Sequence, residues 1–257
     1  MAANECDDCC LMSTNIEADT AVFRAALAGN VQALRVQLPH RVNQRTAEGY
    51  TPLSLAVSAG HADACRLLLR EGASVNNADN LGVTALHHAC MHGYSGMARM
   101  LLLHGANPQA EQAAGQTAAA LAAQYGRPSA LGTLFRHDAS LVDHASSKDR
   151  RTALHWAVLS NHVPTAKYLI GCWGGDVSVT DHVGDTPLHL LGPQMEMLYL
   201  LMYGTCTLPD LQARNDAGRT PEEAAADRGT LDIAAELRHL RELEESGVDT
   251  SIPYSHP

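Results

Sequence analysis

The chain has 257 residues, with 28 acidic and 18 basic side chains, and its net charge is −10 when histidine is neutral. This charge disfavours binding to nucleic acid and to anionic lipid, because both need clustered lysine and arginine. No stretch approaches the roughly 18 consecutive apolar residues of a membrane-spanning helix, so we expect no insertion into a membrane. Hydrophobic residues make up 46% of the chain but aromatic residues only 4%, which indicates an interior of small aliphatic side chains.

Residues 1–16 are mostly small or polar and include Cys6, Cys9 and Cys10. We expect a disordered tail here, and it lacks the basic and apolar regions of a secretory signal. No second group of ligands with zinc-finger spacing follows the three cysteines, so acylation or thiol oxidation is the alternative to an inert tail. The seven cysteines of the chain are scattered, which is typical of a reducing compartment. We therefore expect a cytoplasmic protein, or else a nuclear one.

Six threonines recur at intervals of 33 to 35 residues, and similar phrases surround them, such as G-V-T-A-L-H and G-D-T-P-L-H. They are Thr51, Thr84, Thr117, Thr152, Thr186 and Thr220. This period and this phrase resemble the ankyrin-repeat family, in which each repeat is a β-turn followed by two helices. The resemblance implies an all-α solenoid of about seven helix-turn-helix repeats with β-hairpin fingers between them.

The ankyrin-like region extends over residues 17–246, and its first and last repeats have the character of caps. The predicted repeats lie near 17–48, 49–81, 82–114, 115–149, 150–183, 184–217 and 218–246, and a tail follows at 247–257. In repeat four, Pro128 and Gly132 predict an interrupted second helix.

Repeat six is shorter than the others between its two helices. His189 precedes Gly204 by 15 residues, whereas His87 precedes Gly105 by 18. Three residues are therefore missing between the start of the first helix and the end of the second. The finger that follows this repeat is correspondingly longer.

The recurring phrase has a physical interpretation. A threonine just before a helix can accept hydrogen bonds from the free N–H groups of the first turn. The ankyrin resemblance further implies that His87, His155 and His189 form hydrogen bonds between neighbouring repeats. These three of the 14 histidines therefore need no catalytic or metal-binding explanation.

Common motifs for nucleotide binding, serine hydrolysis and zinc proteolysis are absent from the sequence. A chain built almost wholly of repeats leaves little room for an active site. We expect no enzymatic activity, no cofactor and no metal site.

In ankyrin-repeat proteins, partners dock on the concave face that the first helices and the fingers form. The resemblance therefore implies that four kinds of residue contact a partner. These are the residue before each threonine, the residue after each histidine position, further residues on the same first helices, and residues of the fingers. The expected partner-binding residues are Tyr50, Val83, His88, Met91, Gln116, Tyr125, Arg151, Trp156, Asp185, Asp79, Glu111 and Asp181. Trp156 is the leading candidate because tryptophan, tyrosine and arginine dominate interface hot spots. The alternatives are that Trp156 packs on its own finger and that the acidic fingers are merely solvated.

These features predict a monomeric adaptor or scaffold that binds another protein. One alternative is a substrate-recruiting module, because the segment from Asp149 to Val158 is similar to a repeat of DHHC-type palmitoyltransferases, although the Asp-His-His-Cys motif is absent. Another alternative is an assembly chaperone or inhibitor of a larger complex.

Overall fold

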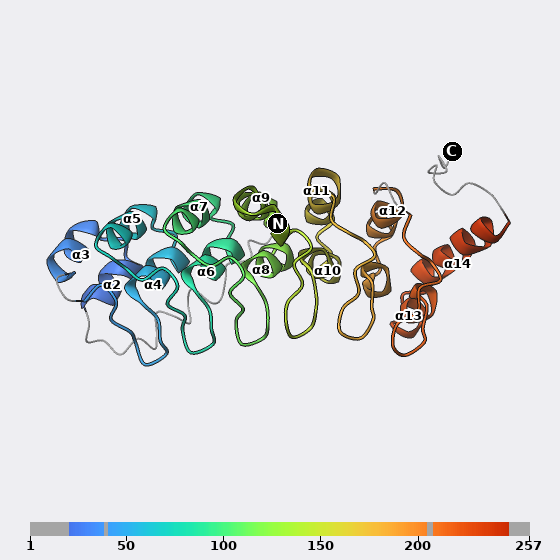
Figure 1. Ribbon diagram of the computed structural model, residues 1–257, viewed down its shortest axis with the longest axis horizontal. Coiled ribbons are helices and arrows are strands. Elements are labelled where there is room, and N and C mark those ends of the chain that lie inside the picture. Colours follow the sequence, from blue (N-terminus) through green and yellow to red (C-terminus); the bar gives the residue numbers. More distant parts are fainter. Residues whose placement is uncertain (1–20, 39–40, 205–207, 247–257) are drawn as a thin grey trace. The chain divides into compact units, whose positions relative to one another are not determined.

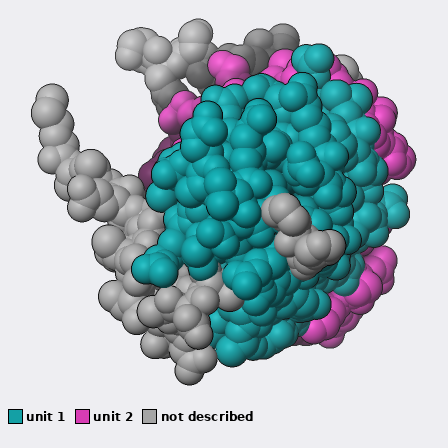
Figure 2. Space-filling model, turned by 90° about the vertical axis from the view of Figure 1, so that its left-hand side faces the viewer, with its two compact units in different colours: residues 1–113 teal, residues 114–257 magenta. Residues whose placement is uncertain are grey.

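The computed structural model describes residues 21–38, 41–204 and 208–246. No β-strand occurs within these ranges, where Ala78 and Thr84 form an isolated antiparallel bridge. The chain divides into two compact units, unit 1 with residues 1–113 and unit 2 with residues 114–257 (Figure 2). The predicted tails, including Cys6, Cys9 and Cys10, lie outside the described residues.

Unit 1 consists of pairs of helices joined by tight turns. They are α2 (Ala21–Leu27), α3 (Val31–Gln37), α4 (Pro52–Ser58), α5 (Ala62–Arg70), α6 (Ala85–Met91) and α7 (Ser95–Leu103). The first helices α2, α4 and α6 form one row, and the second helices α3, α5 and α7 form another (Figure 1). The loops that lead from one pair to the next, which we call fingers, extend beyond the row of first helices (Figure 1).

Unit 2 repeats this arrangement with two irregularities, a 3-10 turn after α9 and a 3-10 turn in place of one first helix. Its elements are α8 (Ala118–Gln124), α9 (Pro128–His137), η1 (Ala139–Leu141), α10 (Ala153–Leu159), α11 (Val163–Trp173), η2 (Pro187–Leu190), α12 (Met195–Tyr203), α13 (Pro221–Asp227) and α14 (Leu231–Glu245). The first helices of this unit are α8, α10 and α13, and η2 takes the same place in repeat six.

The core of each unit is aliphatic, as the composition predicts. The leucines of the recurring phrase, Leu53 and Leu86 in unit 1 and Leu154 and Leu188 in unit 2, are each only 1% exposed. Burying one leucine side chain stabilises the fold by roughly 1.5–3 kcal/mol. Because the phrase recurs once per repeat, this contribution is distributed along the chain rather than concentrated in one centre.

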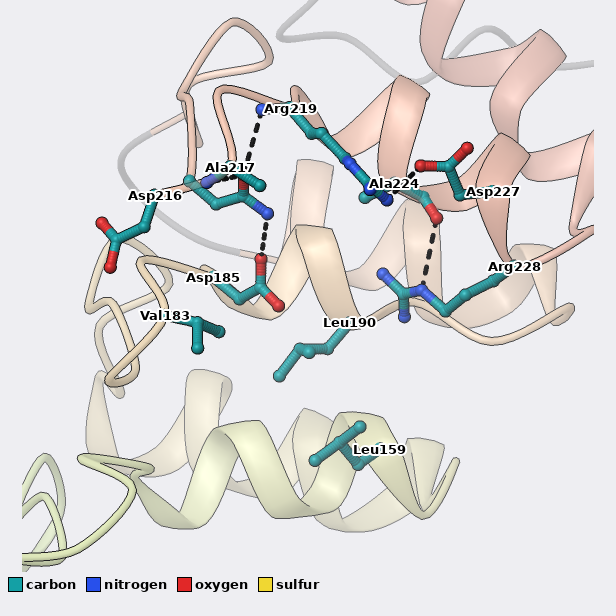
Figure 3. A pocket seen from close by; sticks show the side chains of 11 residues that line it. Leu159, Val183, Asp185, Leu190, Asp216, Ala217, Arg219, Ala224, Asp227 and Arg228 are labelled. Atoms are coloured by element: carbon teal, nitrogen blue, oxygen red, sulfur yellow. Dashed lines mark hydrogen bonds and ion pairs between the residues drawn. The ribbon is translucent and has the colours of Figure 1, made fainter.

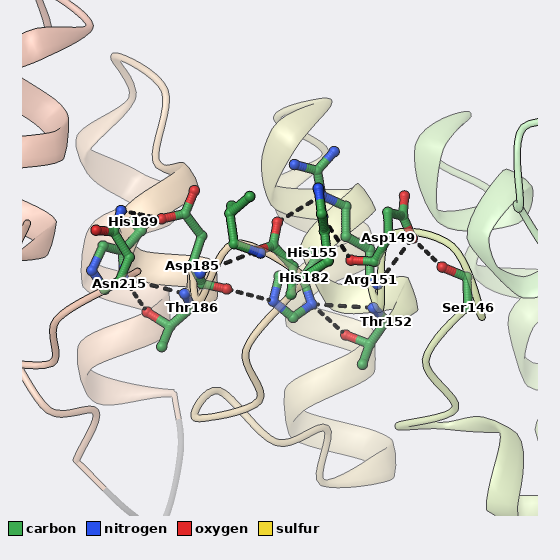
Figure 4. Close-up of polar contacts among 12 residues, drawn as sticks. Ser146, Asp149, Arg151, Thr152, His155, His182, Asp185, Thr186, His189 and Asn215 are labelled. Atoms are coloured by element: carbon green, nitrogen blue, oxygen red, sulfur yellow. Dashed lines mark hydrogen bonds and ion pairs between the residues drawn. The ribbon is translucent and has the colours of Figure 1, made fainter. Parts of the chain in front are cut away.

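His155 links the start of its own helix to the next finger through buried hydrogen bonds (Figure 4). Its Nδ1 atom accepts the backbone N–H of Thr152 at 3.1 Å, so the ring proton must lie on Nε2. That Nε2–H group donates to the carbonyl oxygen of Asp185 at 3.3 Å. The ring is fully buried, and burial lowers the pKa of His155 below its ordinary value. The histidine is therefore neutral, and both of its nitrogens are used.

The other two histidines of the phrase also bond to carbonyl oxygens of fingers. His189 bonds to the carbonyl oxygen of Arg219 at 3.1 Å in unit 2. His87 bonds to the carbonyl oxygen of Ala110 at 3.0 Å in unit 1. The expected hydrogen bonds between neighbouring repeats are therefore confirmed for His155 and His189, whereas the bond of His87 to Ala110 lies within repeat three.

The predicted interruption of the second helix in repeat four is wrong. Pro128 stands at the start of α9, where a missing N–H group leaves no hydrogen bond unmade. Gly132 lies inside the ten-residue helix, where a Cβ atom would come within 2.2 Å of the Tyr168 hydroxyl on α11. Close packing between two second helices therefore accounts for this glycine, which does not mark the end of a helix.

We predict that His155→Ala lowers the free energy of unfolding by about 2 kcal/mol, because it leaves the buried Thr152 N–H group and the Asp185 carbonyl unpaired. Urea unfolding followed by circular dichroism measures this loss. His104→Ala is the control, since His104 is exposed and its side chain bonds to the Met100 carbonyl of the adjacent helix; it should change stability by less than about 0.5 kcal/mol. Equal losses in the two variants would contradict the linking role of His155.

Candidate functional site

Trp156, Arg151 and Asp181 form one cluster in unit 2. The Arg151 guanidinium carbon lies 5.5 Å from the centroid of the Trp156 ring. Arg151 Nε also donates to Asp181 Oδ2 at 3.0 Å, with side-chain exposures of 22% for the arginine and 0% for the aspartate. A cation over a tryptophan face is attracted by the ring quadrupole. The ion pair and the ring together hold Arg151 in one position beside the half-buried tryptophan.

Asp181 organises its own finger as well as holding Arg151. Its Oδ1 atom accepts the backbone N–H groups of Val183 and Asp185, each at 3.0 Å. The Asp79 carboxylate accepts two backbone N–H groups of its finger in unit 1 in the same way, at 2.9 and 2.8 Å. Such local bonds are typical of aspartate in turns. The Asp79 and Asp181 carboxylates therefore stabilise the backbone conformation of their own fingers.

A groove of about 660 Å³ opens in unit 2 near the cluster. Figure 3 shows apolar side chains on one side of it and charged side chains on the other. Its lining residues are Leu159, Val183, Asp185, Leu190, Asn215, Asp216, Ala217, Arg219, Ala224, Asp227 and Arg228. Leu159 and Val183 are 38% and 39% exposed, so the groove presents apolar surface to solvent.

A row of rings lies on the corresponding part of unit 1. The ring centroids of Tyr50 and His88 are 6.5 Å apart, those of His88 and His92 are also 6.5 Å apart, and those of His92 and Tyr94 are 5.5 Å apart. His88 is only 4% exposed, and neither of its ring nitrogens has a hydrogen-bond partner among the described residues. Burial, with His92 and His87 nearby, lowers the pKa of His88 to about 4.

Comparison with known proteins identifies the family. The sequence profile of the family described as "Ankyrin repeats (3 copies)" matches residues 3–79, 22–112 and 107–181. The chain belongs to the ankyrin-repeat family. Its members are generally protein–protein interaction modules, and the fold is typically non-catalytic. No curated protein sequence matches this ankyrin-repeat chain.

Solved structures agree with this assignment. The ankyrin repeat domain of human ASB11 is 26% identical with a TM-score of 0.72, over 84% of this chain and 96% of that one. The ankyrin repeat domain of Bcl-3, described as a unique member of the IkappaB protein family, is 26% identical with a TM-score of 0.71, over 85% of this chain and 99% of that one. The predicted fold class, an all-α ankyrin-repeat solenoid, is confirmed.

The residues predicted to bind a partner differ widely in exposure. Tyr125 is 40% exposed, whereas His88, Gln116 and Asp181 are buried. The half-buried residues are Tyr50, Asp79, Val83, Met91, Glu111, Arg151, Trp156 and Asp185. Within unit 2 the structure brings Arg151, Trp156 and Asp181 together, and within unit 1 it brings Tyr50 beside His88. The three buried side chains act mainly inside the ankyrin-repeat fold.

The groove contains residues that the sequence did not single out, among them Val183, Asp227 and Arg228. They occupy ordinary finger and helix-end positions, so no residue type marks them. The one sequence feature that pointed to this region was the shortened repeat six. The spacing alone did not show that the shortening leaves a groove at the surface.

Other side chains with chemical potential have structural explanations. Cys65 and Cys90 are fully buried, and burial raises the pKa of each thiol to about 12. Neither thiol is ionised near neutral pH, so both behave as small apolar side chains. Within the described ranges no group of three or more His, Cys, Asp or Glu residues could hold a metal ion. None of the helices described is both long and apolar enough to span a membrane.

We predict that His88 makes unit 1 sensitive to acid. An unfolded histidine titrates near pH 6.5, well above the folded pKa of about 4, so the unfolded chain binds the proton first as pH falls. Stability is therefore complete above about pH 6.5 and is lost down to about pH 4, by about 3 kcal/mol in total from this residue.

The variant His88→Leu tests this effect, because Leu55 and Leu121 are buried at the same position of their repeats. It should be more stable than the wild type at pH 7, since it removes two unpaired buried nitrogens, and should lose less stability at pH 4.5. Thermal unfolding at a series of pH values measures both effects. Parallel pH profiles for the wild type and His88→Leu would refute the prediction, and His104→Ala serves as the exposed control.

Proposed function

We propose that this ankyrin-repeat chain is a non-catalytic adaptor that binds a protein partner through the first helices and fingers of unit 2. The observation that carries the proposal is the Arg151–Trp156 pair, held in place by the buried carboxylate of Asp181. Tryptophan and arginine are the residues most enriched among interface hot spots. Their position on a first helix and directly before it agrees with the family's general role in protein binding.

Preorganisation supports the choice of this cluster. A free arginine side chain loses about 0.5–1.5 kcal/mol of conformational freedom when a partner immobilises it. The contacts of Arg151 with the Trp156 ring and with Asp181 restrict that freedom before any partner arrives. A partner that meets the cluster therefore encounters an ordered surface.

Exposed apolar side chains on the same row of helices support the location. Tyr125, directly after α8, is 40% exposed, and Leu159, at the end of α10, is 38% exposed. Large apolar side chains that lie together at the surface mark interaction sites more often than isolated ones do. The proposed binding face therefore combines aromatic, aliphatic and arginine side chains from consecutive repeats.

The experiment is affinity capture from cell extract with the full chain as bait, comparing the wild type with Trp156→Ala and with the double variant Trp156→Ala, Tyr125→Ala. A partner bound through this face should be captured at least about tenfold less by Trp156→Ala, as expected when a hot-spot side chain is truncated. Circular dichroism must show unchanged helical content.

Tyr203→Ala is the matched control, because it truncates a half-buried aromatic residue on the second helix α12. It should leave capture unchanged. If Tyr203→Ala abolishes capture while Trp156→Ala does not, the partner binds to the row of second helices and the proposed face is wrong.

A further inference from the structure

The groove in unit 2 lies where repeat six has a short 3-10 turn in place of its first helix. The 3-10 turn η2 has four residues, whereas α10 and α13, the first helices of the preceding and following repeats, have seven each. Three missing residues correspond to nearly one helical turn, which has about 3.6 residues. Leu191 leaves the helical conformation with φ −55° and ψ 130°, and Pro193 follows shortly and disfavours a helix at the residue before it.

The short turn η2 leaves the ends of α10 and α13 lining a common groove. Leu159 is the last residue of α10, Asp227 is the last of α13, and Arg228 follows it. All three line the groove, and Leu190 of η2 lines it between them (Figure 3). The volume of about 660 Å³ lies within the range of roughly 300–1,000 Å³ that is common for binding pockets.

The two arginines of the groove are already engaged. Arg219 forms an ion pair with Asp227. Arg228 turns inward and donates to the carbonyl oxygens of Ala224 at 3.3 Å and Leu191 at 3.4 Å. Burial lowers the pKa of Arg228, and the nearby Asp185 partly offsets this effect. Neither cation is therefore free for an acidic partner.

The carboxylates on the finger side of the groove are less neutralised. Asp185 accepts one hydrogen bond from the Asn215 amide at 2.7 Å. Asp216 is exposed, and its carboxylate has no hydrogen-bond or ion-pair partner in the part of the chain that the structure describes. The groove therefore offers aliphatic side chains on one side and the unpaired carboxylate of Asp216 beside Asp185 on the other, in a chain whose net charge is −10.

We propose that this groove is the docking pocket for a partner segment that presents an aliphatic side chain next to a lysine or arginine. The aliphatic side chain contacts Leu159, Val183 and Leu190, and the cation faces Asp185 and Asp216. This inference rests on the proposed function, because it specifies the partner chemistry of the same face. The two sites are continuous, since the Asp185 N–H group bonds to Asp181, which holds Arg151.

The test is selection from a display library of short random peptides, with the full chain as bait and Leu159→Glu as a parallel bait. Leu103→Glu is the matched control, since Leu103 is an exposed leucine (73%) on the second helix α7. We expect the wild type and Leu103→Glu to enrich peptides with an aliphatic–basic pair, and Leu159→Glu to lose them. Individual peptides should bind Leu159→Glu at least about tenfold more weakly in fluorescence polarisation.

A charge exchange tests the cation separately. Replacing the basic residue of a selected peptide by glutamate should abolish its binding to the wild type, and Asp216→Arg should restore it. Restoration is not expected if the carboxylates are merely solvated, and its failure would overturn the assigned role of Asp216. Selection of acidic peptides, or of none, would overturn the proposed occupant.

The outcomes distinguish this inference from the proposed function. If selected peptides lose binding in Trp156→Ala but not in Leu159→Glu, the adaptor face stands and the groove is not the docking pocket. If binding survives both substitutions, the first-helix face itself is wrong.

Discussion

The buried hydrogen bonds of His155 hold together the surface on which the proposed function depends. The ring joins the start of α10 to the Asp185 carbonyl of the next finger. The N–H group of Asp185 then bonds to the Asp181 carboxylate, and this carboxylate binds Arg151 beside Trp156. One neutral histidine thus positions a finger, and the finger positions an arginine. Because these groups are shielded from water, each unmade bond would cost more than it would at the surface.

The fully buried carboxylate of Asp181 is stable only because its partners surround it. It accepts two backbone N–H groups and the Arg151 Nε–H group. A buried ion pair contributes little net stability when the desolvation of both charges is counted, but it defines one geometry. Here that geometry keeps the guanidinium against the tryptophan ring. The cluster therefore orders the proposed binding face more than it stabilises the fold.

The groove shows how a solenoid accommodates one shortened helix, here the first helix of repeat six. Each repeat packs mainly against its neighbours, so shortening one first helix removes contacts locally and leaves the remaining repeats paired. In a globular core the same loss would be expected to cause collapse or repacking. In repeat six it leaves Leu159 and Val183 partly exposed beside Asp185 and Asp216. The groove therefore lies at the repeat whose first helix is shortened.

The sequence by itself determined the repeat fold and the linking role of His155 and His189. These features follow from contacts within a repeat or between adjacent repeats, and such contacts recur with the sequence period. The exposure of the individual side chains on the first helices was decided only by the tertiary structure. His88 and Trp156 occupy the same position of their repeats, yet His88 is buried beside Tyr50 while Trp156 is half-buried beside Arg151.

The helix α9 and the groove show the same difference between what the sequence predicts and what only the tertiary structure decides. Pro128 permitted either a helix start or a break, and the packing of Gly132 against Tyr168 is visible only in three dimensions. The three missing residues of repeat six were evident from spacing, but the hollow that they leave depends on the ends of α10 and α13. A periodic sequence specifies the backbone of each repeat, because local hydrogen bonds and burial repeat with it. The side chains outside the recurring phrase are not periodic, and they decide which surfaces remain open.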